Sequence, residues 1–336
     1  MRRLGIFGAL LCVVAVGCSS DDPTVASGSP STSATPSSPT PSAIPTVDAI
    51  ATIPVGGEPI GVTEGFGSVW VVSSEYLSEG KPAVRRIDPA TNEVVATIPV
   101  GKVPLETIDG FGSIWVSNSD DDTVTRIDPT TNEVVATIDV CRAPEGFAVG
   151  AGSVWVVCEV SAAVGRIDPA ANRMRDTIGV GEEPRFATFA FGSVWVSNYL
   201  ESTVTRIDPS RNRVTATIPT DFGCQVLIAF DGTIWVSNTD ADTVQRIDPD
   251  TDEVVATIDT DLAPDGLVEV DGAVWVASEI GPQLSRIDPA TDTVTDTFFV
   301  SDQGAINANQ IVALADGDLW LPLFDPSDVV RVAVPA

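Results

Sequence analysis

From Val47 onward the chain consists of short runs in which hydrophobic and polar residues alternate. Typical runs are SIWVSN (Ser113–Asn118), TVTRID (Thr123–Asp128) and EVVATIDV (Glu133–Val140), separated by turn-forming Gly, Pro, Asn or Asp. An alternation with a period of two places successive side chains on opposite faces of a strand. The pattern therefore predicts an all-β protein built from short antiparallel strands, without a long helix.

The predicted strands belong to a repeat whose phase the tryptophans mark. Consecutive tryptophans are 45, 40, 40, 40, 40 and 45 residues apart, and together they are all the tryptophans of the chain: Trp70, Trp115, Trp155, Trp195, Trp235, Trp275 and Trp320. A glycine lies three residues before each one, where a tight turn needs a positive φ angle. Four short strands in about 40 residues are typical of a propeller blade. We therefore expect a seven-bladed β-propeller with four antiparallel strands per blade.

The two ends of the repeat region predict how the ring closes. The last unit ends with VVRVAVPA, which matches a third strand, so a fourth strand is missing there. The segment VDAIATIPVGGEP, from Val47 to Pro59, matches the fourth strand of other units, such as NEVVATIPVGKVP. We expect this N-terminal strand to complete the last blade, an arrangement that protects the sheet edges.

The first 46 residues differ in character from the repeats. Residues 1–17, MRRLGIFGALLCVVAVG, join two arginines to a short apolar run, which is typical of an export signal. The following AVGC resembles the lipobox of bacterial lipoproteins, and this implies a fatty-acylated Cys18 and a location on the outer face of a bacterial membrane. An ordinary signal peptide with a chance cysteine is the alternative. Residues 18–46, rich in Ser, Thr and Pro, predict a disordered tether to a propeller at 47–336.

Charge and missing residue types exclude several functions. The chain has 18 Lys and Arg against 47 Asp and Glu, so no basic groove for nucleic acid is expected. Histidine is absent, which excludes Ser-His-Asp triads, Cys-His pairs and histidine-ligated metals. In an exported setting we expect a disulfide between Cys141 and Cys158, at the same end of the third unit, with Cys224 left unpaired.

The repeat resembles the YVTN-type β-propeller repeats. The matching elements are VWVSN, DTVTRIDP and NEVVATIPVG, and the resemblance covers roughly Val47 to Ala336. It implies a β-propeller but is a weak guide to function, because such propellers include surface proteins, binding modules and a few enzymes. Virginiamycin B lyase and calcium-dependent lactonases are propellers of a similar kind. The lyase family relies on histidine at its site, which this chain does not contain.

Residues that recur in every unit are expected to build the blades, and those that differ are expected to carry function. We expect the tryptophans to form the core between blades, and the arginines of the Arg-Ile-Asp-Pro motif to bond neighbouring turns. Positions ten residues before and three or four residues after each tryptophan should ring one mouth of the central channel. The ligand-binding residues predicted there are Glu145, Arg185, Gln225, Asp265, Gln310, Asn118, Asn198, Asn238 and Tyr199. A plain solvated loop surface is the alternative.

A second group of carboxylates lies six residues before the tryptophans. Glu64, Asp109 and Glu269 belong to the first, second and sixth units and could point into the channel. Oxygen-only ligands suit Ca²⁺ or Mg²⁺, so these residues are the candidate metal site. A purely structural role is the alternative, and no other cofactor is expected.

These features favour a membrane-tethered, extracytoplasmic and monomeric propeller that binds a small ligand, a peptide, a glycan or an envelope protein. The alternative is a carboxylate-based, Ca²⁺- or Mg²⁺-dependent enzyme similar to a lactonase or lyase. A docking platform in envelope assembly is a third function, which differs from the first only in the size of the partner.

Overall fold

The computed structural model describes residues 44–74, 81–261, 263–281, 283–300, 312–313, 317–323 and 327–334. Residues 43–336 form one compact unit. The predicted export signal, Cys18 and almost all of the predicted tether lie outside the described residues, as does the predicted ligand-binding residue Gln310.

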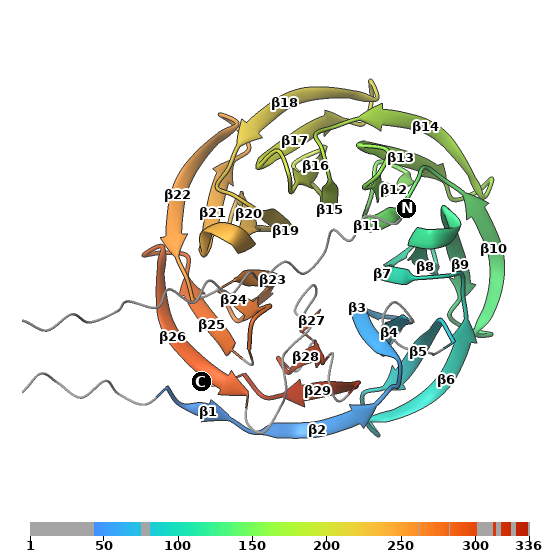
Figure 1. Ribbon diagram of the computed structural model, residues 1–336, viewed down its shortest axis with the longest axis horizontal. Helices are drawn as coiled ribbons and strands as arrows, with labels where there is room; N and C mark the ends of the chain where they lie inside the picture. Colours follow the sequence, from blue (N-terminus) through green and yellow to red (C-terminus); the bar gives the residue numbers. More distant parts are fainter. Residues whose placement is uncertain are drawn as a thin grey trace, which may run out of the picture. The chain divides into compact units, whose positions relative to one another are not determined.

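Seven sheets, each with four antiparallel strands, are arranged in a ring, as the sequence predicts, and the sixth carries one further strand (Figure 1). The first three sheets are β3 (Glu58–Gly65), β4 (Ser68–Ser74), β5 (Ala83–Asp88) and β6 (Glu93–Pro99); β7 (Pro104–Gly110), β8 (Ser113–Asn118), β9 (Thr123–Asp128) and β10 (Glu133–Asp139); and β11 (Pro144–Gly150), β12 (Ser153–Cys158), β13 (Ala163–Asp168) and β14 (Arg173–Gly179). Two 3₁₀ turns, η1 (Ser119–Asp121) and η2 (Thr239–Ala241), follow the second strands of the second and fifth sheets.

The remaining four sheets repeat this arrangement. They are β15 (Pro184–Ala190), β16 (Ser193–Asn198), β17 (Thr203–Asp208) and β18 (Arg213–Pro219); β19 (Cys224–Phe230), β20 (Thr233–Asn238), β21 (Thr243–Asp248) and β22 (Glu253–Asp259); β23 (Pro264–Val270), β24 (Ala273–Ser278), β25 (Gln283–Asp288) and β26 (Thr293–Val300); and β27 (Val312–Ala313), β28 (Leu319–Pro322), β29 (Asp328–Val332) and β2 (Ala49–Pro54). In each sheet the first strand is innermost and the fourth forms the outer wall (Figure 1).

The N-terminal strand completes the seventh blade, as predicted. β2 pairs antiparallel with β29, and the register joins Ala49 to Val332 and Pro54 to Asp328. A feature that the sequence did not reveal is β1 (Thr46–Val47), which adds to the outer edge of the sixth sheet and runs parallel to β26. The start of the propeller is therefore fixed to two neighbouring blades, both built from the end of the chain.

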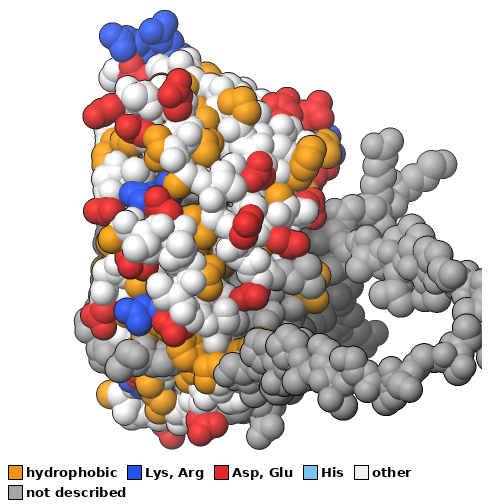
Figure 2. Space-filling model, turned by 90° about the vertical axis from the view of Figure 1, so that its left-hand side faces the viewer, with side chains coloured by type: hydrophobic (Ala, Val, Ile, Leu, Met, Phe, Trp, Pro, Cys, Tyr) orange, Lys and Arg blue, Asp and Glu red, His pale blue; other side chains and the backbone are white. Residues whose placement is uncertain are grey.

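The outer wall of the ring is acidic and half-buried. Exposed residues alternate with less exposed ones in the outer strand β22, because only one face of it packs on the blade, and three consecutive exposed residues occur in β10, β14 and β18. Figure 2 shows one side of this wall, with acidic side chains spread over it and few basic ones. Within the described part of the chain, no helix is long and apolar enough to cross a membrane.

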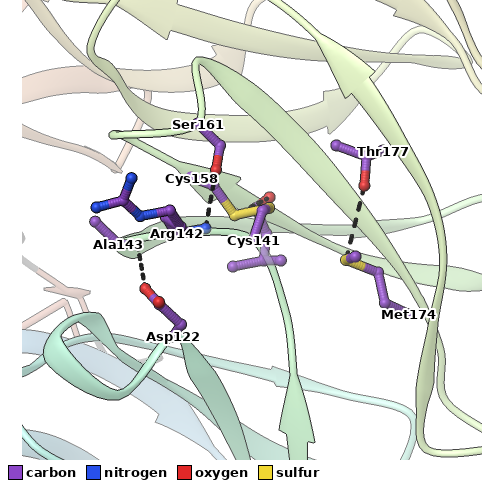
Figure 3. The surroundings of a disulfide bond; sticks show 9 residues. Asp122, Cys141, Arg142, Ala143, Cys158, Ser161, Met174 and Thr177 are labelled. Carbon is purple, nitrogen blue, oxygen red and sulfur yellow. Dashed lines mark hydrogen bonds between the residues drawn. A yellow bond between two sulfur atoms is a disulfide. The ribbon is translucent and has the colours of Figure 1, made fainter.

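The predicted disulfide is present in the third blade. Cys141, in the connection that precedes β11, is bonded to Cys158 at the end of β12. The same connection is fixed by backbone donors, because the amide of Arg142 donates to Ser161 Oγ at 2.9 Å and the amide of Ala143 donates to Asp122 Oδ1 at 2.8 Å (Figure 3). Cys224, in the fifth blade, is buried and free.

The tryptophans form the core between neighbouring blades, as predicted. Trp115 of the second blade packs in one buried cluster with Phe147, Val154 and Ile167 of the third. All seven tryptophans are at most 1% exposed. In the first six blades the glycine turn before the tryptophan has positive φ at both central residues, for example Phe66 (54°) and Gly67 (69°). This is the turn that matches the twist of a two-residue hairpin.

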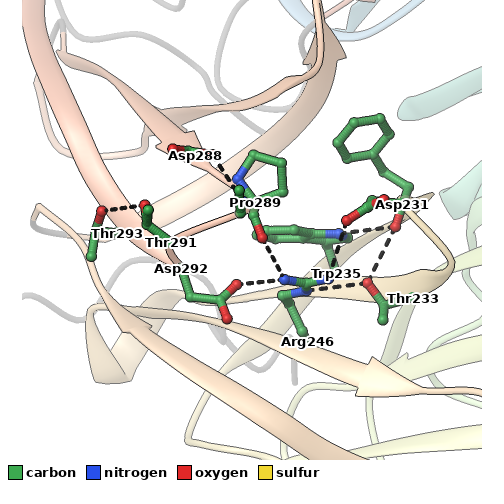
Figure 4. Close-up of polar contacts among 11 residues, drawn as sticks. Asp231, Thr233, Trp235, Arg246, Asp288, Pro289, Thr291, Asp292 and Thr293 are labelled. Atoms are coloured by element: carbon green, nitrogen blue, oxygen red, sulfur yellow. Dashed lines mark hydrogen bonds and ion pairs between the residues drawn. The ribbon is translucent and has the colours of Figure 1, made fainter.

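The repeated arginines of the first five blades bond to a turn of the following blade, which confirms their structural interpretation, whereas Arg286 of the sixth blade lies 3.9 Å from Asp296 of its own blade. In the fifth blade the Arg246 guanidinium lies 4.8 Å from the Trp235 ring centre. Its Nη1 donates to the Pro289 carbonyl at 2.8 Å and to Asp292 Oδ1 at 2.5 Å, both in the following blade (Figure 4). Arg331 makes the equivalent bonds from the seventh blade to the turn of the first, so the same pair of bonds closes the ring.

Candidate functional site

A β-bulge near the start of the innermost strand in each of the first six blades sets the geometry of the candidate site. In the third blade Pro144 pairs with Cys158 and Phe147 pairs with Val156, so the inner strand has one residue more than its neighbour between the two pairs. The same irregularity recurs in the inner strands of blades one, two, four, five and six. A bulge of this kind redirects side chains and is frequent beside functional sites.

The bulges hold the residues that differ most between blades. The charged or polar residues at these positions are Glu106 on β7, Glu145 on β11, Arg185 on β15, Gln225 on β19 and Asp265 on β23. We call these five residues the axial cluster, because the innermost strands surround the axis of the ring (Figure 1). Four of the five were predicted as site residues from the sequence, and the structure brings them together at one end of the inner strands.

A buried hydrogen bond between Arg185 and Glu145 joins two neighbouring blades within the axial cluster. Arg185 Nη1 donates to Glu145 Oε1 at 2.8 Å, and the two side chains are 10% and 8% exposed. Arg185 Nη2 also lies 3.7 Å from Glu159 and 3.5 Å from Glu183. Burial raises the pKa of Glu145 to about 8, although Arg185 opposes this shift. Burial lowers the pKa of Arg185, but its three carboxylate neighbours more than offset this, and the net shift is upward.

Two further carboxyl groups of the axial cluster are buried without an ion-pair geometry of this kind. Asp265 is 0% exposed, and within the described residues neither of its oxygens has a hydrogen-bond partner. Glu106 is 3% exposed, and its Oε2 likewise has no partner among them. Burial raises the pKa of both groups well above the usual range. The charges of Glu145 and Asp265 both act on the pKa of Glu106, so the carboxyl group of blade two lies within electrostatic reach of those of blades three and six.

A half-buried polar layer lies next to the axial cluster. Tyr199, predicted as a site residue, stacks beside the Arg185 guanidinium at 5.4 Å and donates its hydroxyl to Asp240 Oδ2 at 2.8 Å. Burial and this bond to a carboxylate raise the tyrosine pKa. Glu279 is half-buried, and burial followed by the charge of Asp240 raises its pKa. The site is therefore rich in carboxyl groups and contains one central cation.

The predicted asparagines belong to the scaffold instead of to a ligand-binding surface. Asn118 and Asn198 are fully buried, and each spans the blade from a glycine amide to threonine hydroxyls. Asn238 is also buried and donates to Thr243 at 3.1 Å. Asn118 and Asn198 thus hold the connection that leads into their own blade, whereas Asn238 Oδ1 has no hydrogen-bond partner within the described residues.

The structure does not assemble the candidate metal site. Glu64, Asp109 and Glu269 are exposed, and Glu269 accepts a hydrogen bond from the Gly272 amide at 2.9 Å. Among the residues that the structure describes, no group of three or more Asp, Glu, Cys or His is placed to hold a metal ion. Asp109 instead borders a hollow of about 400 Å³ at the far ends of β7, β11 and β15.

Glu106 was missed by the sequence analysis, although the sequence contains a signal for it. Its position, nine residues before the tryptophan, is occupied by glycine or an apolar residue in all the other units. A Cβ on Gly61, the equivalent in the first blade, would lie 2.7 Å from Glu106 Oε2. The Glu106 carboxyl group therefore lies against a glycine of the neighbouring blade. The only signal for it in the sequence is a charged residue at a position where the other units have glycine or an apolar residue.

The fold defines the protein as a seven-bladed β-propeller with a polar axial cluster. Its similar solved structures include a streptogramin B lyase (TM-score 0.71, 15% identity, 85% of this chain and 97% of that chain) and the selenomethionine-substituted virginiamycin B lyase of Staphylococcus aureus (0.71, 14%, 83% and 95%). Hydrazine synthase from Kuenenia stuttgartiensis is also similar (0.71, 14%, 82% and 96%). No protein-family model and no curated protein sequence matches the chain. At these identities the likeness shows the fold alone.

Proposed function

We propose that the chain is an exported, lipid-anchored binding protein and that the axial cluster is its binding site. The observation that supports this is the Asp265 carboxyl group, which is fully buried with both oxygens unpartnered within the described residues. Burying a polar group without a hydrogen bond costs free energy, and each such group calls for an explanation. A ligand that bonds to Asp265 supplies that explanation and also accounts for the concentration of unlike residues at the bulges.

The anchor is supported by the arginines, the apolar run and the cysteine that precede the Ser/Thr/Pro-rich segment. An acyl chain on Cys18 would keep the propeller close to a membrane, where it could capture a ligand outside the cell. Labelling of the expressed chain with radioactive palmitate tests this part. Label that disappears in Cys18→Ser supports the anchor, and equal label in both chains, or none in either, contradicts it.

The binding function is tested with the full chain in detergent, using its own tryptophan fluorescence to follow thermal unfolding. The panel contains cationic, neutral and anionic small compounds, short peptides and oligosaccharides, each added to the wild type and to Asp265→Asn. A ligand that binds only the native state, at a hundred times its Kd, stabilises it by about 2.7 kcal/mol. A compound that raises Tm in the wild type but not in Asp265→Asn supports the proposal. A panel in which no compound does so contradicts it.

A second candidate function is an enzyme that transfers a proton. The observation that favours it is the pKa of Glu145, about 8, which suits a general acid or base near neutral pH. The Ca²⁺- or Mg²⁺-dependent version lacks a group of ligands among the described residues. The test is to incubate the chain with a streptogramin B, the compound class named for one similar structure, and to analyse the products by mass spectrometry. Conversion of the compound that is lost in Glu145→Gln would favour the enzyme. Recovery of the compound unchanged would favour the binding protein.

A further inference from the structure

We propose that the axial cluster binds an organic cation through primary ammonium or guanidinium N–H groups, and that this binding releases protons from the cluster. The inference rests on the proposed function and specifies the class of its ligand. It follows from which atoms lack partners, how far apart the carboxyl groups are, and where the positive charge of the site is already used.

The unpartnered atoms of the axial cluster are mostly acceptors. Within the described residues they are both carboxyl oxygens of Asp265, Oε2 of Glu106 and Oε1 of Gln225, against one donor, Nε of Arg185. All of these atoms are buried, so water in bulk does not satisfy them. A ligand that completes these bonds must bring several N–H or O–H donors, and an ammonium group provides three of them in one atom.

The spacing of the carboxyl groups favours a ligand that is larger than a metal ion. Glu106, Glu145 and Asp265 are near enough for their charges to interact across the axis of the ring. They are nevertheless not grouped closely enough to hold a metal ion, within the part of the chain that the structure describes. A metal ion needs its oxygen ligands at about 2.0–2.6 Å. An organic cation with N–H groups at both ends of a short chain can reach carboxyl groups on different blades.

The positive charge of Arg185 is already surrounded, which disfavours an anionic ligand. Its guanidinium is bonded to Glu145 and lies within 4 Å of Glu159 and Glu183. An anion would have to displace one of these carboxylates and approach the others. A cation instead reaches the carboxyl groups of Glu106 and Asp265, whose unpartnered oxygens lie on other blades.

Proton release follows from the protonation state of these carboxyl groups. Burial favours the neutral acid, and it raises the pKa of Glu106 and Asp265 well above the usual range and that of Glu145 to about 8. A bound cation favours the ionised form, so the carboxyl O–H bond breaks, its proton passes to the buffer and the oxygen accepts an N–H group. The charged groups that face these carboxyls from the packed strands are Arg185, Glu159, Glu183 and Glu279.

The experiment compares three four-carbon probes that differ in charge: diaminobutane, butanediol and succinate. Binding to the full chain in detergent is measured by calorimetry at pH 6, 7 and 8, in two buffers with different ionisation enthalpies. We expect diaminobutane alone to bind, with its affinity rising up to tenfold per pH unit for each proton released. Asp265→Asn should lose at least tenfold in affinity, and Glu106→Gln is a second variant in case the first does not fold. Asp259→Asn, the same substitution at an exposed position, should bind like the wild type.

Each outcome separates this inference from the proposed function. Diaminobutane binding that is insensitive to Asp265→Asn and releases no protons would show only attraction to the acidic surface, and it would overturn the inference. Binding of butanediol or succinate that is lost in Asp265→Asn would overturn the cationic ligand class but support the axial binding site. If the inference is correct but diaminobutane has the wrong length, cations with longer chains from the thermal panel should still bind. The same calorimetry should show that their binding releases protons. Failure of every cation in that panel overturns the inference.

Discussion

Replacing Glu145 by glutamine tests whether burial or the ion pair controls this site. The pKa of Glu145 is about 8 in the folded protein against an ordinary value of 4.5. Because one pKa unit corresponds to about 1.4 kcal/mol, this difference amounts to about 5 kcal/mol. The folded state holds a proton that the unfolded state loses, so the contribution to stability is present below pH 4.5. It is lost as the pH rises to about 8.

Glutamine does not titrate, so Glu145→Gln should remove this dependence on pH. The variant has its own offset, because Arg185 exchanges a carboxylate for an amide, but that offset should not change with pH. We expect the free energy of unfolding of the variant, minus that of the wild type, to increase by about 5 kcal/mol between pH 4.5 and pH 8. Urea unfolding followed by tryptophan fluorescence, at constant ionic strength, measures this difference.

The control is Glu253→Gln, which makes the same change at an exposed position on β22 and should give a constant difference. If the difference for Glu145→Gln is also constant, Glu145 is ionised in the folded protein. The 2.8 Å contact with Arg185 then outweighs burial, and the reasoning given for the other buried carboxyl groups fails with it.

Three further predictions concern the scaffold. Arg331→Lys should lower the free energy of unfolding by about 2 kcal/mol, because lysine cannot reproduce the forked bonds to the first blade. Arg126→Lys, which breaks the equivalent bonds inside the ring, should lower it by as much in urea unfolding. A loss of stability in only one of the two variants would contradict the equivalence of these bonds. Gly146→Ala should lower Tm by several degrees, because the new Cβ would lie 2.5 Å from a backbone oxygen of the next blade. In the control Gly179→Ala the new Cβ would have no atom within 4 Å, so Tm should not change. Cys224, whose pKa burial raises to about 11, should resist iodoacetamide at pH 8 until urea is added, and rapid labelling of the native protein would argue against its burial.

The architecture was predictable because each blade repeats the same solutions to the same packing problem. Trp115 and its equivalents fill the space between sheets, and Gly67 and its equivalents take the positive φ of a hairpin turn. These residues must recur wherever the geometry recurs, so their spacing predicts blade number and strand order. The closing strand was predictable for the same reason, since β2 has the sequence of a fourth strand.

The site was predictable only in part, because a sequence does not show where a polar side chain finds its partners. Asn198 has the residue type of a ligand-binding group, but a glycine amide and two threonines satisfy it within the blade. Glu106 has the residue type of a surface acid, but the bulge of β7 buries it. Bulges depend on the pairing of two strands, so the alternation of residues along either strand does not reveal them.

The joint between β2 and β29 connects residues that are nearly the whole chain apart, with Ala49 paired to Val332, and only noncovalent contacts hold it. Such a joint can open without disturbing the hydrogen bonds inside the first five blades, although exchange of the N-terminal segment also releases β1 from β26 of the sixth. Two copies that open there could exchange their first strands and form a swapped dimer in which every blade has four strands. A disulfide engineered between β2 and β29 would prevent this exchange and would convert the ring into a covalently closed one.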